Sequence, residues 1–226
     1  LVARPAKGSS CTLAVSAKGG NNAENHNHND IGSYAVALGK CTMVGDQGGP
    51  FSYPGDYFSA EAPEKYKIKG SFGHPVPVVD GKTQSSGAKA SAIVLKKEFT
   101  DVKDLLCIDY TSAYSTPSLD KLVRTFVYDR QGKGSFTVGD EFTANAPIRF
   151  ETAITTQANW KIIDDTHLLL TTGTEQMTVT IEASGKVAFT SETIEVNSPA
   201  YTRIGISLKE QSKDGYIRLT MRTKQL

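Results

Sequence analysis

From residue 88 onward, short runs of alternating apolar and polar residues follow one another with only brief interruptions. A period of two is typical of strands with one buried face, and the interruptions are rich in Gly, Asp, Asn, Lys and Ser, as turns are. Many short strands at close spacing indicate a sandwich of large antiparallel sheets. The expected strands are residues 88–99, 104–110, 123–128, 135–142, 148–155, 160–163, 167–171, 177–181, 186–190, 202–208 and 217–223.

The predicted fold class is therefore all-β, a large antiparallel β-sandwich of the supersandwich kind with little or no helix. A single helical turn is expected near residues 117–121. No compositional break and no Pro/Gly/Ser-rich linker divides the sequence, so residues 1–226 are expected to form one domain. Because the chain begins at Leu1 rather than at Met, we expect a processed product or an expressed fragment.

Charge and hydropathy exclude two classes of partner. The 25 basic and 24 acidic residues give no broad attraction to nucleic acid or to an anionic membrane. No apolar run approaches the ~20 residues that span a bilayer. The three cysteines (Cys11, Cys41 and Cys107) lie in apolar, strand-like runs, and an odd number does not form a disulfide framework, so we expect free thiols packed in the core.

The most polar part of the sequence is residues 19–34, where His26 and His28 stand one residue apart among asparagines. Such residues are poor strand formers, and buried polar groups cost free energy unless they are paired, so this stretch is either a site or a long loop. In an extended chain, residues i and i+2 share a face, and the two imidazoles would project side by side. Two such rings suit a transition metal, or one metal ligand beside an acid/base group. The alternative is a polar loop with two solvated histidines.

Residues 33–38 and 41–44 are predicted to form a hairpin, because a two-residue turn containing Gly separates them. The second strand leads into Asp46, so this carboxylate is expected to return to the level of the histidines. The alternative is an Asp in an ordinary glycine-rich turn.

The third histidine, His74, is followed by Pro75 and Pro77, which exclude a helix and a central strand and favour an extended edge or a loop. Together with the first two histidines and Asp46 it completes a His/His/Asp set. The fourth histidine, His167, begins an apolar strand and is expected to be structural. Trp160 and Phe150 are expected in the core.

Residues 50–66 are rich in Pro, Gly and aromatic residues and show little periodicity, as an irregular surface excursion does. Tyr53 and Tyr57 are candidates for sugar binding, because aromatic faces pack on sugar C–H faces; the alternative is that they hold the loop down. The sequence has no Gly-x-Ser-x-Gly elbow and no glycine loop that would cradle a phosphate before a helix.

Three sequence blocks together resemble the heparinase II/III family of polysaccharide lyases. They are residues 26–34 (HNHNDIGSY), residues 44–48 (VGDQG) and residues 72–81 (FGHPVPVVDG), in this order. The similarity is clearest over residues 8–155 and covers only the C-terminal β-sandwich domain of the family. The N-terminal α-helical toroid of these enzymes has no counterpart in this chain.

The resemblance implies cleavage of a uronic-acid-containing polysaccharide, such as heparin or heparan sulfate, by β-elimination. A base removes the proton beside the uronate carboxylate, an acid protonates the leaving oxygen, and donors neutralise the carboxylate. Carried over by motif, His26 would be the catalytic histidine, and His28, Asp46 and His74 would hold a metal. Two imidazoles and one carboxylate fit zinc with one position left for water, whereas calcium prefers six or more oxygen ligands.

The resemblance also sets the wider expectations. The partners would be an acidic polysaccharide and the helical domain of the same parent chain, and the location would be exported, in a bacterial periplasm or secreted. Asn25, Tyr53 and Tyr57 are candidate substrate-binding residues, although neither tyrosine maps onto the catalytic tyrosine of the family. Since the toroid supplies catalytic side chains, this piece alone is expected to be inactive or nearly so.

Three other readings remain open. In a cupin-like metalloenzyme, a Glu would follow His28 by three or four residues, but Gly32 and Ser33 lie there. A second reading is a non-catalytic carbohydrate-binding sandwich with a structural metal. The third is a relic domain with neither metal nor ligand.

Overall fold

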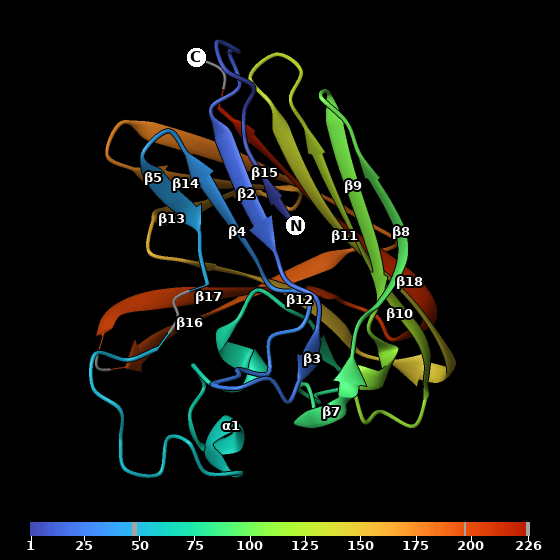
Figure 1. Cartoon of the computed structure of the whole chain (residues 1–226). Coiled ribbons are helices and arrows are strands. Elements are labelled where there is room, and N and C mark those ends of the chain that lie inside the picture. Colours follow the sequence, from blue (N-terminus) through green and yellow to red (C-terminus); the bar gives the residue numbers. More distant parts are fainter. Residues whose placement is uncertain (47–48, 197, 225–226) are drawn as a thin grey trace.

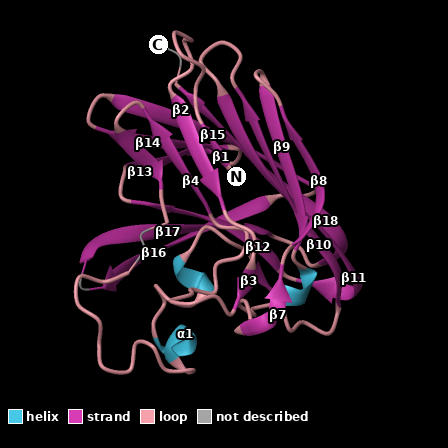
Figure 2. Cartoon of the chain, in the orientation of Figure 1, coloured by secondary structure: helices cyan, strands magenta, loops and turns pink. Residues whose placement is uncertain are grey.

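Antiparallel strands make up most of the structure, a computed structural model that describes residues 1–46, 49–196 and 198–224 (Figures 1 and 2). The largest sheet has eight strands, which in spatial order are β13 (Asn159–Asp164), β14 (His167–Thr172), β15 (Glu175–Ala183), β18 (Ser212–Thr223), β11 (Ser135–Ile148), β10 (Leu119–Asp129), β9 (Lys103–Asp109) and β8 (Ile93–Phe99).

Two four-stranded sheets and one strand pair complete the architecture. The first sheet has the order β1 (Val2–Ala3), β2 (Leu13–Ala17), β4 (Tyr34–Leu38) and β5 (Cys41–Val44). The second has the order β16 (Val187–Val196), β17 (Ser198–Leu208), β12 (Phe150–Thr156) and β6 (Val78–Val79). The pair consists of β3 (Asn21–Asn22) and β7 (Gly87–Ser91). The all-β fold with large antiparallel sheets is confirmed, and each predicted strand overlaps an observed one.

Aromatic contacts show how the sheets pack face to face. The rings of Phe126 on β10 and Phe136 on β11 stack with centroids 6.2 Å apart, and Tyr34 on β4 lies 5.9 Å from Phe136. Phe142 on β11 stacks on Phe150 on β12 at 4.6 Å. The eight-stranded sheet therefore forms one layer, and the two four-stranded sheets face it, as seen for β2 and β4 in Figure 1. Burying these rings is the main favourable term in the core.

The alternation in the sequence accounts for which residues face the core. In β10, Leu122, Arg124, Phe126 and Tyr128 are all fully buried, whereas the residues between them are partly exposed. β8, the outermost strand of its sheet, is exposed along its whole length. Charged side chains at an edge, such as the lysines of β8, oppose pairing with another chain.

Helical structure is short and is not where the sequence predicts it. The described helices are α1 (Ala62–Lys65) and the 3₁₀ turns η1 (Ser71–Gly73) and η2 (Thr111–Ala113). The helical turn predicted near residues 117–121 is wrong: Pro117 and Ser118 form a turn, and Leu119 already pairs with Ala144 of β11. Pairing across the sheet overrides local preference here. No helix in the described ranges has the length and apolar character needed to cross a bilayer.

Other expected core residues lie largely where the sequence placed them. The three cysteines are free, and Cys11 is buried while Cys41 and Cys107 are half-buried. Phe150 is buried, and Trp160 packs partly buried against the core.

The short elements α1, β3, β7 and η1 gather at one end of the sheets (Figure 1). Hydrogen bonds fix the strand ends there. The amide of Gly45, after β5, donates to Thr155 O on β12 at 3.0 Å, and Thr156 Oγ1 donates to Met43 O at 2.6 Å. These bonds join the two four-stranded sheets and set the position of the next residue, Asp46.

Candidate functional site

The segment that carries the first two histidines is turned rather than extended. The amide of Asn27 donates to Glu24 O at 3.2 Å, and His26 has a φ of 56°, in the left-handed region. A non-glycine residue there carries strain and is uncommon, although less so for histidine than for most residues. The prediction that His26 and His28 lie side by side on one face of an extended segment is wrong, because the turn separates their directions. His26 is exposed, with its ring edge-on to Phe58 at 5.2 Å.

His28 instead points to the third histidine. The ring centroids of His28 and His74 are 5.2 Å apart, and Asp46 Oδ2 lies 3.0 Å from His74 Nδ1. The hairpin thus brings Asp46 back to the histidines, as the sequence indicates. A second carboxylate belongs to this cluster: ligand atoms of Asp30, Asp46 and His74 lie within 4.8 Å of one another.

Each member of the cluster has a partner that orients it. His74 is 1% exposed, and its Nε2 donates to Ile68 O at 2.9 Å, which leaves Nδ1 facing Asp46. The Tyr57 hydroxyl lies 3.2 Å from His28 Nε2. Asp30 accepts from Lys18 Nζ at 2.5 Å. Such outer partners fix ring orientation and tautomer in metal sites.

Burial and neighbouring charges shift the pKa values of His28 and His74 in opposite directions. Burial, together with nearby His74, lowers the pKa of His28 to about 4, so that its ring is neutral near pH 7. Burial also opposes charging of His74, but the carboxylates of Asp46 and Asp30 outweigh it and raise the pKa of His74. A neutral imidazole is the form that binds a metal.

A buried arginine ties the site loops to the sandwich core. Arg124 is fully buried and forms a two-pronged ion pair with Asp140, with both N–O distances 2.7 Å. Its Nη1 also donates to Gly32 O at 2.6 Å and to Pro75 O at 2.8 Å. These carbonyls belong to the loops that carry Asp30 and His74, so one side chain holds both loops.

Gln84 and Gly73 complete this support. The amide of Gln84 accepts from Ile31 N at 3.0 Å and donates to Ile31 O at 2.7 Å, which pins the loop beside Asp30. Gly73, before His74, lies against Lys67, where a Cβ would be 2.2 Å from the carbonyl oxygen of that residue. Only glycine permits this approach.

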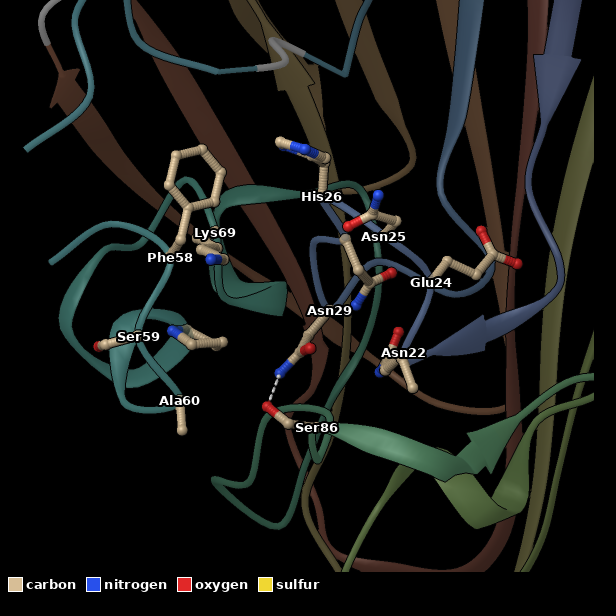
Figure 3. A pocket seen from close by; sticks show the side chains of 13 residues that line it. Asn22, Glu24, Asn25, His26, Asn29, Phe58, Ser59, Ala60, Lys69 and Ser86 are labelled. Atoms are coloured by element: carbon tan, nitrogen blue, oxygen red, sulfur yellow. Dashed lines mark hydrogen bonds between the residues drawn. The ribbon is translucent and has the colours of Figure 1, made fainter.

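A pocket of about 370 Å³ opens beside the cluster (Figure 3). Amide side chains (Asn22, Asn25, Asn27, Asn29), hydroxyls (Ser59, Ser86), His26, Phe58 and Lys69 contribute to its lining. The Nδ2 of Asn29 donates to Ser86 Oγ at 2.9 Å across its floor, the bond drawn in Figure 3. Amides and hydroxyls around one aromatic face suit a sugar, whose hydroxyls need partners and whose C–H face packs on rings.

The candidate sugar-binding residues fall in different surroundings. Asn25 is exposed on the pocket wall. Tyr53 is 57% exposed, and its ring lies 5.2 Å from that of Phe58 and 5.0 Å from that of Tyr57. Tyr57 is 1% exposed and directs its hydroxyl to His28. Tyr53 can therefore meet a ligand directly, whereas Tyr57 contacts the candidate metal ligand.

The sequence reasoning missed three residues of this region: Asp30, Lys69 and Arg124. Asp30 lies in the same sequence block as His26 and His28, so its position alone is a signal for a candidate metal ligand. Arg124 has a signal too, since it is a charge in phase with the buried positions of its strand. Lys69 has none, because its burial depends on packing by Tyr57 and Phe58, in the irregular segment that precedes it. Gln47 and Gly48, part of the predicted glycine-rich turn, lie outside the described residues.

The cluster fits a divalent transition metal by the chemistry of its donors. Imidazole and carboxylate groups, largely shielded from water and held by outer partners, match the ligand types of zinc. His28, Asp46 and His74 are the set predicted from the sequence; Asp46 and His74 have ligand atoms within 4.8 Å of one another and of Asp30, whereas His28 does not belong to that group of described residues. Asp30 is the further oxygen donor that the structure adds.

The fold of this chain is that of solved heparinases over nearly its whole length. The heparan sulfate lyase HepC from Pedobacter heparinus matches 95% of this chain with a TM-score of 0.75 at 15% identity. A heparinase III matches 96% at TM-score 0.73 and 16% identity, and another heparinase III matches 96% at 0.70 and 12%. This chain covers 34%, 34% and 33% of them, respectively, so it spans about a third of their length. No family model and no curated protein sequence matches. The fold implied by the motif resemblance is confirmed.

Proposed function

We propose that this chain is the metal-binding β-sandwich part of a lyase that cleaves uronic-acid-containing polysaccharide, of the heparin or heparan sulfate kind, by β-elimination. The observation that supports the proposal is that Asp46 and His74 meet from separate sequence blocks, with the His28 ring 5.2 Å from that of His74, near a pocket lined by His26. The fold shared with heparinases supports it. The similarity to a heparan sulfate lyase and to heparinase III also motivates the choice of substrate.

In the proposed reaction, His26 acts on the uronate residue of the substrate. Elimination removes the proton on the uronate carbon beside the carboxylate, its electrons form a carbon–carbon double bond, and the bond to the leaving glycosidic oxygen breaks. His26, exposed on the pocket, serves as the base or as a donor to the carboxylate. Asn25, beside it, is placed to donate to the carboxylate or to a sugar hydroxyl. A second side chain, from the rest of the parent protein, protonates the leaving oxygen.

The metal that we propose is zinc, held by His28, Asp46 and His74. When bound, zinc would supply a fixed positive charge that holds the two loops together. Elimination needs no nucleophilic water, so the proposed role of the metal is structural. Tyr57 orients His28, and the Ile68 carbonyl orients His74. The turn that carries His26 is thereby set against the pocket.

We also propose that the chain is one domain of a longer, exported protein. A continuous cluster of buried side chains runs from the first strands to the last ones described, which supports a single domain. The remaining part, a helical domain, would close the pocket and add the missing acid. The isolated chain is then inactive or nearly so.

The test is turnover of heparan sulfate by the full-length protein, followed as rising ultraviolet absorbance of the new double bond. His26→Ala is expected to lower kcat at least about 100-fold, the usual contribution of an acid/base group. The matched control is Lys65→Met, an exposed lysine on α1 that is ion-paired with Asp56. Full activity in His26→Ala would refute the role of His26, and turnover by the 226-residue chain alone would refute its dependence on a second domain.

A non-catalytic sugar-binding module is the second candidate. Phe51, Tyr53 and Phe58 are 81%, 57% and 54% exposed on the loop beside the pocket, more than folding requires. Exposed aromatic faces of this kind bind sugars without chemistry. Normal glycan affinity in His26→Ala, with no loss of turnover in the full-length protein, would favour this reading.

A further inference from the structure

Lys69 is a buried lysine without a carboxylate partner in the parts of the chain that the structure describes. Its residue is 7% exposed, and its Nζ donates to Tyr57 O. The ammonium also lies 5.0 Å from the ring centroids of Tyr57 and Phe58. Of its three N–H donors, the ammonium needs only one for that carbonyl. Burying an ammonium without an anion is costly, so such a group is a candidate for function.

This ammonium belongs to the lining of the pocket that carries His26. Figure 3 shows Lys69 beside Phe58, on the part of the wall near His26. Glu24 also contributes to the lining but is exposed. The pocket therefore presents one poorly hydrated positive charge next to the candidate catalytic histidine.

The opposite part of the lining has an unused acceptor. Asn22 is 4% exposed, and its Nδ2 donates to Gln84 Oε1 at 3.1 Å and to Ser85 O at 2.8 Å. Its Oδ1 is buried and has no hydrogen-bond partner among the residues that the structure describes. A buried acceptor without a donor costs free energy, and a ligand hydroxyl would satisfy it.

We propose that Lys69 binds the carboxylate of a uronate residue in this pocket, with Asn22 Oδ1 accepting from a hydroxyl of the same sugar. The inference rests on the proposed function and deepens it, because it assigns the carboxylate-neutralising charge to a residue of this chain. One cation facing one anion of unit charge matches a carboxylate, and the burial of Lys69 reduces screening of the attraction by water. His26 is then free to act as the base.

The test is calorimetric titration of the 226-residue chain at low salt with three oligosaccharides. The first is an unsulfated oligosaccharide of alternating glucuronate and N-acetylglucosamine. The second is the same oligosaccharide with each carboxyl reduced to a primary alcohol. The third is the reduced form carrying 6-sulfate groups, which separates a carboxylate from a sulfate as the source of the negative charge. The variants are Lys69→Met and Lys69→Arg, with Lys65→Met as the exposed control.

The wild type is expected to bind the uronate form at least about tenfold more tightly than either reduced form, the effect of one hydrogen bond to a charged group. Lys69→Met should lose this preference, Lys69→Arg should keep part of it, and Lys65→Met should keep all of it. Replacing Lys69 with Met removes the hydrogen bond to Tyr57 O, so the unfolding midpoint is expected to fall modestly while the chain still folds. Should Lys69→Met fail to fold, a change in the Lys69 ε-methylene NMR signal of wild type on adding the uronate form, but not the reduced form, gives the same answer.

Three results would each overturn the inference. Lys69→Met could keep the preference of the wild type for the uronate form, the wild type could bind the sulfated form more tightly than the uronate form, or it could fail to bind the uronate form. None of these outcomes decides the proposed function. That function is tested separately, by turnover of the full-length protein and of its His26→Ala variant. Loss of turnover in His26→Ala with unchanged binding preference in Lys69→Met would keep the lyase and reject this role of Lys69.

Discussion

The guanidinium of Arg124, in the centre of the sandwich, donates to the carbonyl oxygen of Pro75, the residue that follows His74, at 2.8 Å. The same group donates to Gly32 O and pairs with Asp140. The arginine of a fully buried ion pair is thus hydrogen-bonded to both loops that form the candidate metal site. The rigidity of the site and the stability of the core depend on the same side chain.

Arg124→Met is expected to lower the free energy of unfolding by about 3–5 kcal/mol, because it leaves the Asp140 carboxylate buried without its partner. Denaturant unfolding of the chain measures this value. Arg218→Met is the control: Arg218 is exposed, pairs with Glu182 on a neighbouring strand, and should change stability by less than about 1 kcal/mol. Equal effects of the two variants would show that Arg124 does not hold the core.

Elemental analysis of the purified chain distinguishes the two candidate ligand sets. The wild type is expected to hold about one equivalent of zinc, and His28→Ala, Asp46→Asn and His74→Ala are expected to lose it. Asp30→Asn should retain the metal, because Lys18 and Ser33 already occupy the Asp30 carboxylate. If Asp30→Asn loses zinc and His28→Ala retains it, the metal ligands are Asp30, Asp46 and His74 rather than His28, Asp46 and His74.

Tyr57→Phe is expected to weaken zinc binding about tenfold while the chain remains folded, since it removes the hydroxyl that orients His28. The stability loss should be about 1 kcal/mol, the contribution of one hydrogen bond. Competition with a chromogenic chelator measures the affinity. Tyr66→Phe is the matched control, because the Tyr66 hydroxyl donates to the exposed Asp56 instead. If both variants bind zinc alike, Tyr57 does not act through His28.

Stability of the metal-free chain is expected to fall as the pH drops from about 6.5 to about 4. Burial and His74 lower the pKa of His28 from its ordinary value of 6.5 to about 4, so in this window the unfolded chain binds a proton that the folded chain does not. The loss reaches at most about 3 kcal/mol and is complete below pH 4. His74, whose pKa is raised, acts in the opposite sense: its contribution is present at low pH and is lost as the pH rises through its folded pKa.

Unfolding curves with a chelator present, for wild type and His28→Gln, measure this dependence. The variant should show a shallower decline over the same window, because it lacks the group that takes up the proton on unfolding. An identical slope in the two proteins would mean that His28 is not buried as a neutral ring.

The sequence predicted the strands from residue 88 onward and the hairpin, and it offered His28, Asp46 and His74 as candidate metal ligands. A period of two is a local property, so the alternation in residues 123–128 and 135–142 predicts strands without knowledge of their partners. The two-residue turn predicted that Asp46 returns toward the histidines, although a shift in the pairing between Val36 and Ala37 changes the register beyond the turn. Even Arg124 and Asp140 could be recognised, as charges in phase with buried apolar neighbours.

Tertiary structure alone decided how these residues face one another. The turn at His26 separates two histidines that an extended chain would place side by side, and the exposed His26 ring packs edge-on against Phe58. The burial of Lys69 comes from Tyr57 and Phe58, on a loop whose sequence shows no periodicity. Local patterns specify which backbone face is apolar, whereas side-chain direction and desolvation in loops depend on three-dimensional contacts that no periodic pattern encodes.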